Sequence, residues 1–184
     1  MSTDKEVFVY RINSRDEIYY TSGNWDTFAL ENGGLKCQSE YILGRKIWEY
    51  IDSVEIRQLY HDIAARVLQT GKSATIPINC DSPALRREML LTVVRLPGNE
   101  IEYRSQLIRT IPREPIDLLQ GGRTHDGTLL QMCCYCKSIA VSAELWLPTE
   151  LAIVELDLFH RESLPGISHG VCPACYEIIM NEPE

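Results

Sequence analysis

The chain has 184 residues, 45% hydrophobic and 24% charged, a composition typical of a globular protein with a substantial core and not of a disordered chain. Its formal net charge of -8 and the lack of a basic run argue against a nucleic-acid-binding protein, which needs clustered lysine and arginine. Residues 1–6 are polar, unlike a signal peptide, and no apolar run approaches the roughly 18 residues that span a bilayer. We therefore expect a cytoplasmic protein with reduced cysteines and no membrane contact.

The N-terminal stretch predicts a β-hairpin followed by short helices. Residues 7–12 and 18–20 are rich in β-branched and aromatic side chains, and the polar residues 13–16 supply turn chemistry between them. The apolar residues of 24–30 have helical spacing, and Gly33-Gly34 is a natural end for that helix. A second short helical turn is expected over 44–51, with its aromatic side chains facing inward.

The longest helix is predicted over residues 52–70. Asp52-Ser53-Val54-Glu55 has the form of a capping box in which the carboxylate of Asp52 replaces the usual hydroxyl. Gly71 is a natural C-terminal stop. The residues of its apolar stripe recur at helical spacing: Ile56, Leu59, Tyr60, Ile63, Ala64 and Val67.

Three strand-like segments follow the long helix. Residues 75–80 alternate in polarity, and Pro77 indicates an edge strand because proline cannot donate to a ladder. Residues 86–96 and 101–111 are longer and are separated by turn residues at 97–100. Together the three segments predict an antiparallel meander.

This order of elements resembles that of PAS-like sensor domains, in which a five-stranded antiparallel sheet cups helices around a small pocket. The segment from Asp16 through Trp25 to Ala29 is similar to the second strand and first helix of that family. The segment Leu43-Gly44-Arg45-Lys46-Ile47-Trp48 resembles the sequence motif that precedes the family's long helix. The resemblance covers residues 7–112 and implies an α+β fold with a sensing or protein-interaction role.

A PAS-like pocket implies side chains that could line it, and these are also the side chains of an ordinary core. His61 lies on the flank of the long helix, where we expect a surface histidine and not a haem ligand. The candidate pocket residues are Phe8, Tyr10, Trp25, Trp48, Tyr60 and Ile63.

The C-terminal part changes character after residue 112. Residues 113–127 contain Pro115, Gly121-Gly122 and Gly127 and predict a linker. Residues 128–181 predict a separate cysteine-rich zinc-binding module, in which 128–132 form a strand and 176–180 a short helix. Residues 146–159 fit both helical and strand periods, and we favour the helix.

Two Cys-x-x-Cys pairs are the most specific chemical signal in the chain. Cys133 and Cys136 form the first pair, and Cys172 and Cys175 form the second. Paired thiolates at this spacing can turn toward one ion, and zinc is bound by such sets at about 2.3 Å. We predict a structural zinc site with four cysteine ligands, with Cys134 leaving open which thiol of the first pair binds. A site of three cysteines and His169, an iron–sulfur site, a redox-active dithiol and unligated thiols remain alternatives.

The same region resembles a cysteine-rich module that follows PAS domains in bacterial sensor kinases and related signalling proteins. The matching residues are Cys133-x-x-Cys136-Lys137, then Trp146, then Ser168-His169-Gly170-Val171-Cys172-Pro173-Ala174-Cys175. The resemblance implies a bacterial signalling protein.

The two resemblances together imply a non-enzymatic signal-transduction module that acts through a signalling partner or as a homodimer, and whose pocket could take a small-molecule ligand. Four protein ligands leave no open position for activated water, and no metalloprotease-like general base is present. The alternative function is a thiol or metal redox sensor, in which oxidation of the cysteine cluster releases zinc. A catalytic thiol oxidoreductase is less well supported because the pairs lack a surrounding βαβ pattern.

Overall fold

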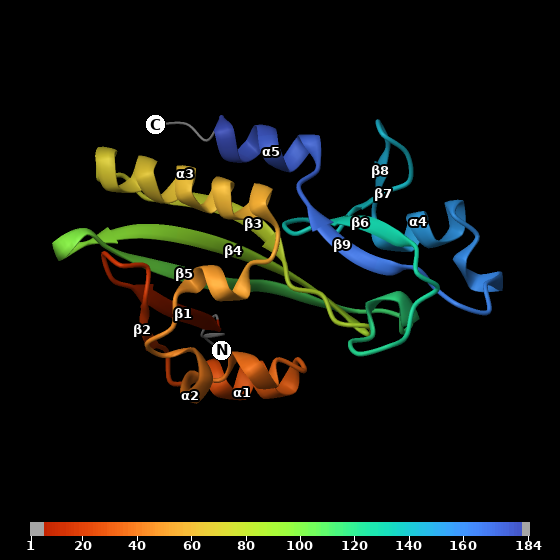
Figure 1. Cartoon of the computed structure of the whole chain (residues 1–184), viewed down its shortest axis with the longest axis horizontal. Helices are drawn as coiled ribbons and strands as arrows, with labels where there is room; N and C mark the ends of the chain where they lie inside the picture. The colour runs from red at the N-terminus through yellow and green to blue at the C-terminus, as the bar shows by residue number, and fades with distance from the viewer. Residues whose placement is uncertain (1–5, 182–184) are drawn as a thin grey trace. The chain divides into compact units, whose positions relative to one another are not determined.

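The computed structural model describes residues 6–181, and these form two compact units (Figure 1). The first unit contains residues 6–76 and Met89–Ile108. The second contains Pro77–Glu88 and Arg109–Asn181. Each unit is therefore assembled from segments that are separate in the sequence.

A five-stranded antiparallel sheet with the order β2-β1-β5-β4-β3 organises the first unit. Tyr10 lies opposite Tyr103 where β1 pairs with β5. The predicted hairpin and meander are confirmed, and Pro77 lies on an edge strand as predicted. The strands are β1 Val7–Ile12, β2 Ile18–Thr21, β3 Ala74–Asn79, β4 Leu85–Leu96 and β5 Glu100–Pro112.

Of the three helices that the structure describes in this unit, the first and the third place aromatic rings on one face of the sheet. Phe8 and Tyr10 alternate along β1 and therefore share a face, and the rings of Phe8 and Phe28 lie 4.1 Å apart. On that face Tyr103 stacks on Tyr10 at 4.7 Å and on Tyr60 at 5.9 Å. The helices are α1 Trp25–Glu31, α2 Ser39–Ile42 and α3 Val54–Thr70, with 3-10 turns at Leu35–Cys37, Ile47–Tyr50 and Pro97–Asn99.

The two ends of α3 test the predicted stop and start signals. Gly71 has a left-handed backbone with φ of 72°, and its N–H donates to the carbonyl of Val67, as a C-terminal glycine does. The predicted start is wrong by one residue: the N-cap is Ser53, whose side chain accepts from the N–H of Ile56. The hydroxyl therefore holds the capping position that we had assigned to the carboxylate of Asp52.

The second unit contains a small four-stranded sheet with the order β8-β7-β6-β9. Strands β6 and β9 are parallel, whereas β7 is antiparallel to both β6 and β8. The elements are β6 Leu129–Cys133, β7 Ile139–Ala140, β8 Trp146–Leu147, α4 Thr149–Glu155, β9 Gly166–Gly170 and α5 Pro173–Met180, with 3-10 turns at Asp117–Leu119 and Leu158–His160.

Apolar side chains from several separate segments form the core of this unit. Residues 146–159 contain both predicted alternatives in succession, a two-residue strand and then α4. The predicted helix 176–180 begins earlier, at Pro173. The core cluster consists of Ile116, Leu118, Met132, Ile139, Ala152, Ile153 and Leu158.

The predicted domain ranges 7–112, 113–127 and 128–181 remain predictions, and the compact units divide the chain differently. Ile116 and Leu118 of the predicted linker are buried in the core of the second unit. Residues Pro77–Glu88, from the middle of the predicted PAS-like range, also belong to that unit. Hydrophobic burial therefore gives Ile116 and Leu118 a structural role that the proline and glycine content of the predicted linker did not indicate.

Candidate metal centre

The four cysteines of the paired motifs lie together in the second unit. Their Sγ atoms are all within 4.8 Å of one another. Cys133 is the last residue of β6, Cys172 is the N-cap of α5, and Cys175 lies in the first turn of that helix. Cys133, Cys172 and Cys175 are buried, and Cys136 is half-buried. The sequence spacing therefore identified four thiols that the fold brings to one point.

The parallel pairing of β6 with β9 brings the two cysteine turns side by side. Cys133 lies opposite Gly170 in this ladder, and the N–H of Cys134 donates to the carbonyl of Gly170 at 2.9 Å. The carboxyl ends of parallel strands meet at one edge, so each strand leads directly into its own cysteine turn. Pro173 then opens α5 at a position where its missing N–H costs nothing.

Gly170 lies where β9 passes close to a side chain of β6. It lies within β9, and a Cβ built on it would come 2.4 Å from Nε2 of Gln131 on the neighbouring strand. Gln131 is exposed, so its side chain can move away from an added methyl group. The glycine therefore relieves a side-chain contact between β9 and β6.

Backbone hydrogen bonds close the first cysteine turn. The N–H of Cys133 donates to the carbonyl of Ser138 at 2.8 Å, and the N–H of Lys137 donates to the carbonyl of Cys133 at 3.1 Å. Lys137 adopts a left-handed backbone with φ of 63°. Its ammonium donates to the carbonyl of Cys134 at 2.8 Å, which holds this cation at the first cysteine turn.

Two of the sulfurs also form hydrogen bonds with neighbouring polar groups: Sγ of Cys172 accepts one, and Sγ of Cys136 donates one. The N–H of Cys175 lies 3.4 Å from Sγ of Cys172. Sγ of Cys136 lies 3.2 Å from Oγ of Ser138. Contacts of this kind orient thiolate ligands and partly offset their charge.

Burial and neighbouring sulfurs shift the pKa of three of the clustered thiols, those of Cys136, Cys172 and Cys175. Hydrogen bonds from the thiols of Cys133 and Cys175 lower the pKa of Cys136, whereas hydrogen bonds with Cys133 and Cys136 raise the pKa of Cys175. Burial is the main cause that raises the pKa of Cys172 to about 11. Without a cation, one thiolate is therefore stabilised at the expense of its neighbours. A divalent ion removes this conflict because it favours ionisation of all four.

The spacing fits a single tetrahedral ion. Four sulfurs at about 2.3 Å from one zinc lie about 3.8 Å from one another, and Sγ of Cys136 lies 3.7 Å from Sγ of Cys172. A multinuclear iron–sulfur cluster spreads its thiolates around several irons, which needs wider separations than 4.8 Å. The four cysteines can hold one metal ion, and their geometry suits zinc or any other thiolate-binding ion of that size.

The alternative ligands that the sequence offered lie outside this group of sulfurs. His169 is an exposed residue of β9 and is not among the clustered ligand atoms. Cys134 is also outside the group, and burial raises the pKa of its thiol to about 12. Cys37 is exposed and Cys80 is half-buried, and neither joins the group.

Most of the candidate pocket residues pack against other aromatic rings of the first unit. Phe8 and Ile63 are buried. The ring of Trp25 meets that of Tyr10 edge-on at 5.7 Å, and Tyr10 and Tyr60 both stack on Tyr103. These contacts bring Tyr10, Trp25 and Tyr60 into one aromatic cluster.

Trp48 has a different environment from the other candidates. It lines a cleft of about 330 Å³ together with Asp16 and His61. Its indole N–H donates to Oδ2 of Asp16 at 2.9 Å, and its ring lies 3.9 Å from that of His61. His61 is exposed, as predicted. The cleft combines an aromatic wall with carboxylate and imidazole groups.

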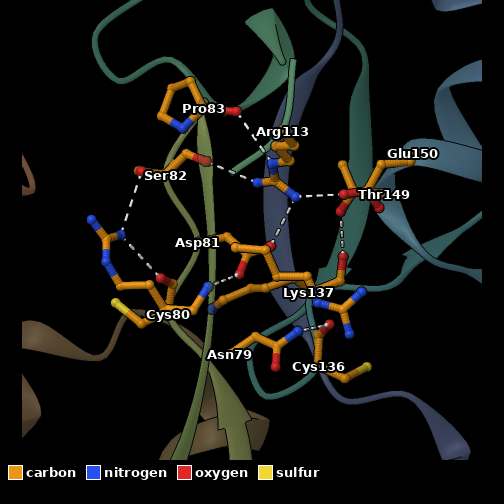
Figure 2. Close-up of polar contacts among 12 residues, drawn as sticks. Asn79, Cys80, Asp81, Ser82, Pro83, Arg113, Cys136, Lys137, Thr149 and Glu150 are labelled. Carbon is orange, nitrogen blue, oxygen red and sulfur yellow. Dashed lines mark hydrogen bonds and ion pairs between the residues drawn. The ribbon is translucent and has the colours of Figure 1, made fainter. Parts of the chain in front are cut away.

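A polar network beside the first cysteine turn was not predicted (Figure 2). The backbone N–H of Asn79 donates to the carbonyl of Tyr135 at 2.6 Å, and its side-chain amide donates to the carbonyl of Cys136 at 3.2 Å. The hydroxyl of the buried Thr149 donates to the carbonyl of Lys137 at 2.7 Å. The cysteine turn is therefore supported by β3 and α4.

Arg113 connects the same segments through a largely buried ion cluster (Figure 2). Its side chain is 9% exposed and contacts Asp81, 4% exposed, at 3.1 Å and Glu150 at 2.7 Å. Its guanidinium also donates to the carbonyls of Ser82 at 2.8 Å and Pro83 at 3.2 Å. No local pattern marks these residues, because each reads as an ordinary turn or linker residue until the fold brings them together.

No family model matches the chain, and no curated protein or solved structure is significantly similar to it. Among residues 6–181, none of the helices is long and apolar enough to cross a membrane.

Proposed function

We propose that the chain is a non-enzymatic bacterial signal-transduction module, in which a PAS-like sensing or docking domain carries a structural zinc site with four cysteine ligands. It acts through a protein partner or by self-association. The observation that carries the zinc part is the convergence of four cysteine sulfurs within 4.8 Å. The sensing part rests on the sheet, the cleft and the sequence resemblance.

A structural role for the metal follows from the ligand set. Four protein sulfurs complete the tetrahedral preference of zinc, which leaves no position for a reactive water. Three of the four sulfurs belong to buried residues, and backbone hydrogen bonds close the turns that carry them. Metal binding at such a site supplies folding free energy, since the unfolded chain has no preformed site.

Support for a PAS-like domain comes from the order of its elements. A hairpin, short helices, a long helix and three antiparallel strands form a five-stranded sheet, as the family resemblance implies. The cleft of about 330 Å³ has the size of a small-molecule site and is lined by both apolar and titratable groups. We propose this cleft, with Trp48 at its wall, as the ligand or docking site.

A reducing compartment suits this proposal, and we propose the cytoplasm. All seven cysteines are free thiols in the structure, and a zinc site made of four cysteines requires reduced thiolates. The chain catalyses no reaction of its own in this proposal. The signal therefore passes to a partner protein or to a second copy of the chain.

Metal analysis with matched cysteine variants tests the zinc site. We expect an equivalent of zinc in the purified protein by elemental mass spectrometry. Cys133→Ser is expected to lose the metal and to melt at a lower temperature, because its sulfur is fully buried within the cluster. Cys134→Ser is the control. It is expected to keep the metal and the wild-type melting temperature, because Cys134 lies outside the cluster.

Zinc retained at full occupancy in Cys133→Ser, with an unchanged melting curve, would refute the assignment. Iron or another metal in the native protein would keep the site and replace the ion.

Native mass spectrometry of the purified protein tests the sensing part. A reproducible adduct that disappears in Trp48→Ala, with the metal retained, would support the cleft as a ligand site. A dimer that dissociates in the same variant would support docking instead. The ligand site and the docking site would both be refuted by a wild-type protein that is monomeric and carries no adduct. The same protein would also have to capture no partner whose binding depends on Trp48.

A further inference from the structure

The four clustered cysteines are not equally exposed. Cys133, Cys172 and Cys175 are buried, with relative exposures of 0%, 4% and 8%. Cys136 is the half-buried member of the group. Cys136 is therefore the residue of the group that is most exposed to solvent.

A small polar cavity of about 160 Å³ opens beside this cysteine. A water molecule in the liquid occupies about 30 Å³, so the cavity can hold a molecule as small as hydrogen peroxide. Cys136 lines the cavity together with Asn79, Arg86, Lys137, Ser138 and Thr149. Its size and polarity suit a small uncharged oxidant better than an apolar ligand.

A hydrogen-bond donor without a partner among the described residues lies in the lining of this cavity. Oγ of Ser138 already accepts from Sγ of Cys136 at 3.2 Å, so the free donor belongs to another residue. Arg86 lines the cavity, and its Nε is buried without a hydrogen-bond partner among the residues that the structure describes. A buried unpaired donor is costly, and a ligand oxygen in the cavity would satisfy it.

The sulfur of Cys172 is close enough to react with an oxidised Cys136. Sγ of Cys172 lies 3.7 Å from Sγ of Cys136, on the opposite cysteine turn. A disulfide needs an S–S distance of about 2.05 Å, which a modest rotation of the two side chains would approach. A disulfide between Cys136 and Cys172 would therefore link the two cysteine turns. It would not link the two cysteines of one Cys-x-x-Cys motif.

We propose that Cys136 is an oxidation site for hydrogen peroxide or a small hydroperoxide, which enters through the polar cavity, and that the oxidised sulfur is resolved by Cys172. The proposal rests on the zinc site proposed above and names the sulfur through which that site is regulated.

Hydrogen peroxide is the oxidant in this reaction, and it takes up two electrons. The thiolate of Cys136 attacks one peroxide oxygen, the O–O bond breaks, and the products are a sulfenic acid and hydroxide. The thiolate of Cys172 then attacks the sulfur of that sulfenic acid, an S–S bond forms, and a second hydroxide leaves. Two electrons pass from the two sulfurs to the peroxide, and solvent protonates both hydroxides. The disulfide removes two of the four metal ligands, so the protein loses its zinc.

Peptide mapping of the zinc-loaded protein tests the assignment directly. The protein is treated with less than one equivalent of hydrogen peroxide, with and without dimedone, and digested without reduction. We expect the dimedone adduct on Cys136, several-fold above that on the other three cluster cysteines. Without dimedone we expect a Cys136–Cys172 disulfide, with an equivalent of zinc released for each disulfide formed. Cys37 is exposed, and its oxidation is measured separately from its own peptide.

A matched pair of arginine variants tests the cavity. Arg86→Met removes the unpaired donor and is expected to slow sulfenic acid formation on Cys136 several-fold, with the zinc content unchanged. Arg161→Met changes an exposed arginine of the same unit that does not line this cavity, and its rate should equal that of the wild type.

The outcomes separate the two proposals. A purified protein without metal refutes the zinc site before any peroxide is added. A zinc-loaded protein that forms a Cys133–Cys136 or Cys172–Cys175 disulfide, or that keeps its zinc at excess peroxide, refutes the oxidation site alone. Equal rates for Arg86→Met and wild type would remove the cavity from the proposal.

Discussion

Glu102 is a buried carboxylate of the first unit with two arginine partners. Its side chain is 4% exposed, and it accepts from Nε of Arg11 at 2.8 Å and from Arg104. Burial opposes its ionisation, but the hydrogen bonds from the two arginines outweigh burial and lower its pKa below the ordinary 4.5. The ionised carboxylate therefore stabilises the folded sheet at neutral pH.

Glu102→Gln is expected to lower the free energy of unfolding by about 1–2 kcal/mol at pH 7, because two arginines lose their charged partner. The folded-state pKa is depressed, so the wild-type stabilisation is present above pH 4.5 and is lost as the pH falls through the folded-state pKa. The gap between variant and wild type should therefore shrink below about pH 4. Denaturant unfolding at pH 7 and pH 3.5 measures it.

Glu31→Gln is the control for this change, since Glu31 is exposed at the end of α1. Its stability should follow that of the wild type at both pH values. A gap for Glu102→Gln that stays constant with pH would mean that packing, and not charge, explains the loss.

Single residues were predictable where a fixed spacing carries the chemistry. The four clustered cysteines could be named from the sequence because two short motifs specify them. The Asp81–Arg113–Glu150 cluster could not, because its members come from a hairpin end, a proline-rich segment and a helix start. Charges that meet only in the folded chain leave no periodic signal.

At the scale of elements, α3 shows how far sequence patterns reach. Its apolar stripe predicted the helix, and Ile56, Leu59, Ile63, Ala64 and Val67 are its buried residues. Its start was misplaced by one residue because Asp52 and Ser53 are both good N-caps, and only the backbone geometry distinguishes them. Periodicity thus locates a helix better than it locates the end.

Ser53→Ala is expected to destabilise the first unit by about 1 kcal/mol, because the N–H of Ile56 loses its capping partner. Asp52→Ala is the matched control and should have a much smaller effect. Thermal unfolding of both variants measures the difference, and the reverse order of effects would restore the capping box that begins at Asp52.

Two strands of the second unit were missed for a physical reason. β7 has only two residues, and β9 contains the sequence Gly-Ile-Ser-His-Gly, which has weak strand propensity. β9 is stabilised by pairing with β6, far away in the sequence. Pairing with a strand that is distant in the sequence overrides local propensity. No short window of the sequence contains both β6 and β9.

For the whole molecule, the unexpected feature is the end of the β3–β4 hairpin. Residues Pro77–Glu88 lie within the predicted PAS-like range and yet belong to the second unit. Asn79 donates to the carbonyls of Tyr135 and Cys136, and Asp81 pairs with Arg113. The predicted boundary at residue 112 followed composition, which carries no information about these contacts.

Removal of the metal is expected to release the hairpin end together with the cysteine turns. After treatment with a zinc chelator, backbone amides of 79–88 should lose protection from hydrogen exchange in parallel with those of 129–147 and 166–180. Amides of β1 and α3 should keep theirs, since they belong to the first unit. Hydrogen-exchange mass spectrometry resolves these segments.

Adding zinc in excess of the chelator is the control and should restore protection in all three segments. Protection of 79–88 that is unaffected while the cysteine turns exchange would show that the hairpin end is held independently of the metal.

The parallel pairing of β6 with β9 has a consequence for biosynthesis. A parallel neighbour cannot be made by a tight turn, so the chain must complete the stretch that contains β7, β8 and α4 before β9 can pair. The first cysteine pair is therefore synthesised well before the second, and a product that stops before Gly166 has two of the four cysteines and an open edge on β6. The four-sulfur group therefore forms only after α5 has been synthesised, because Cys172 and Cys175 lie at the start of that helix.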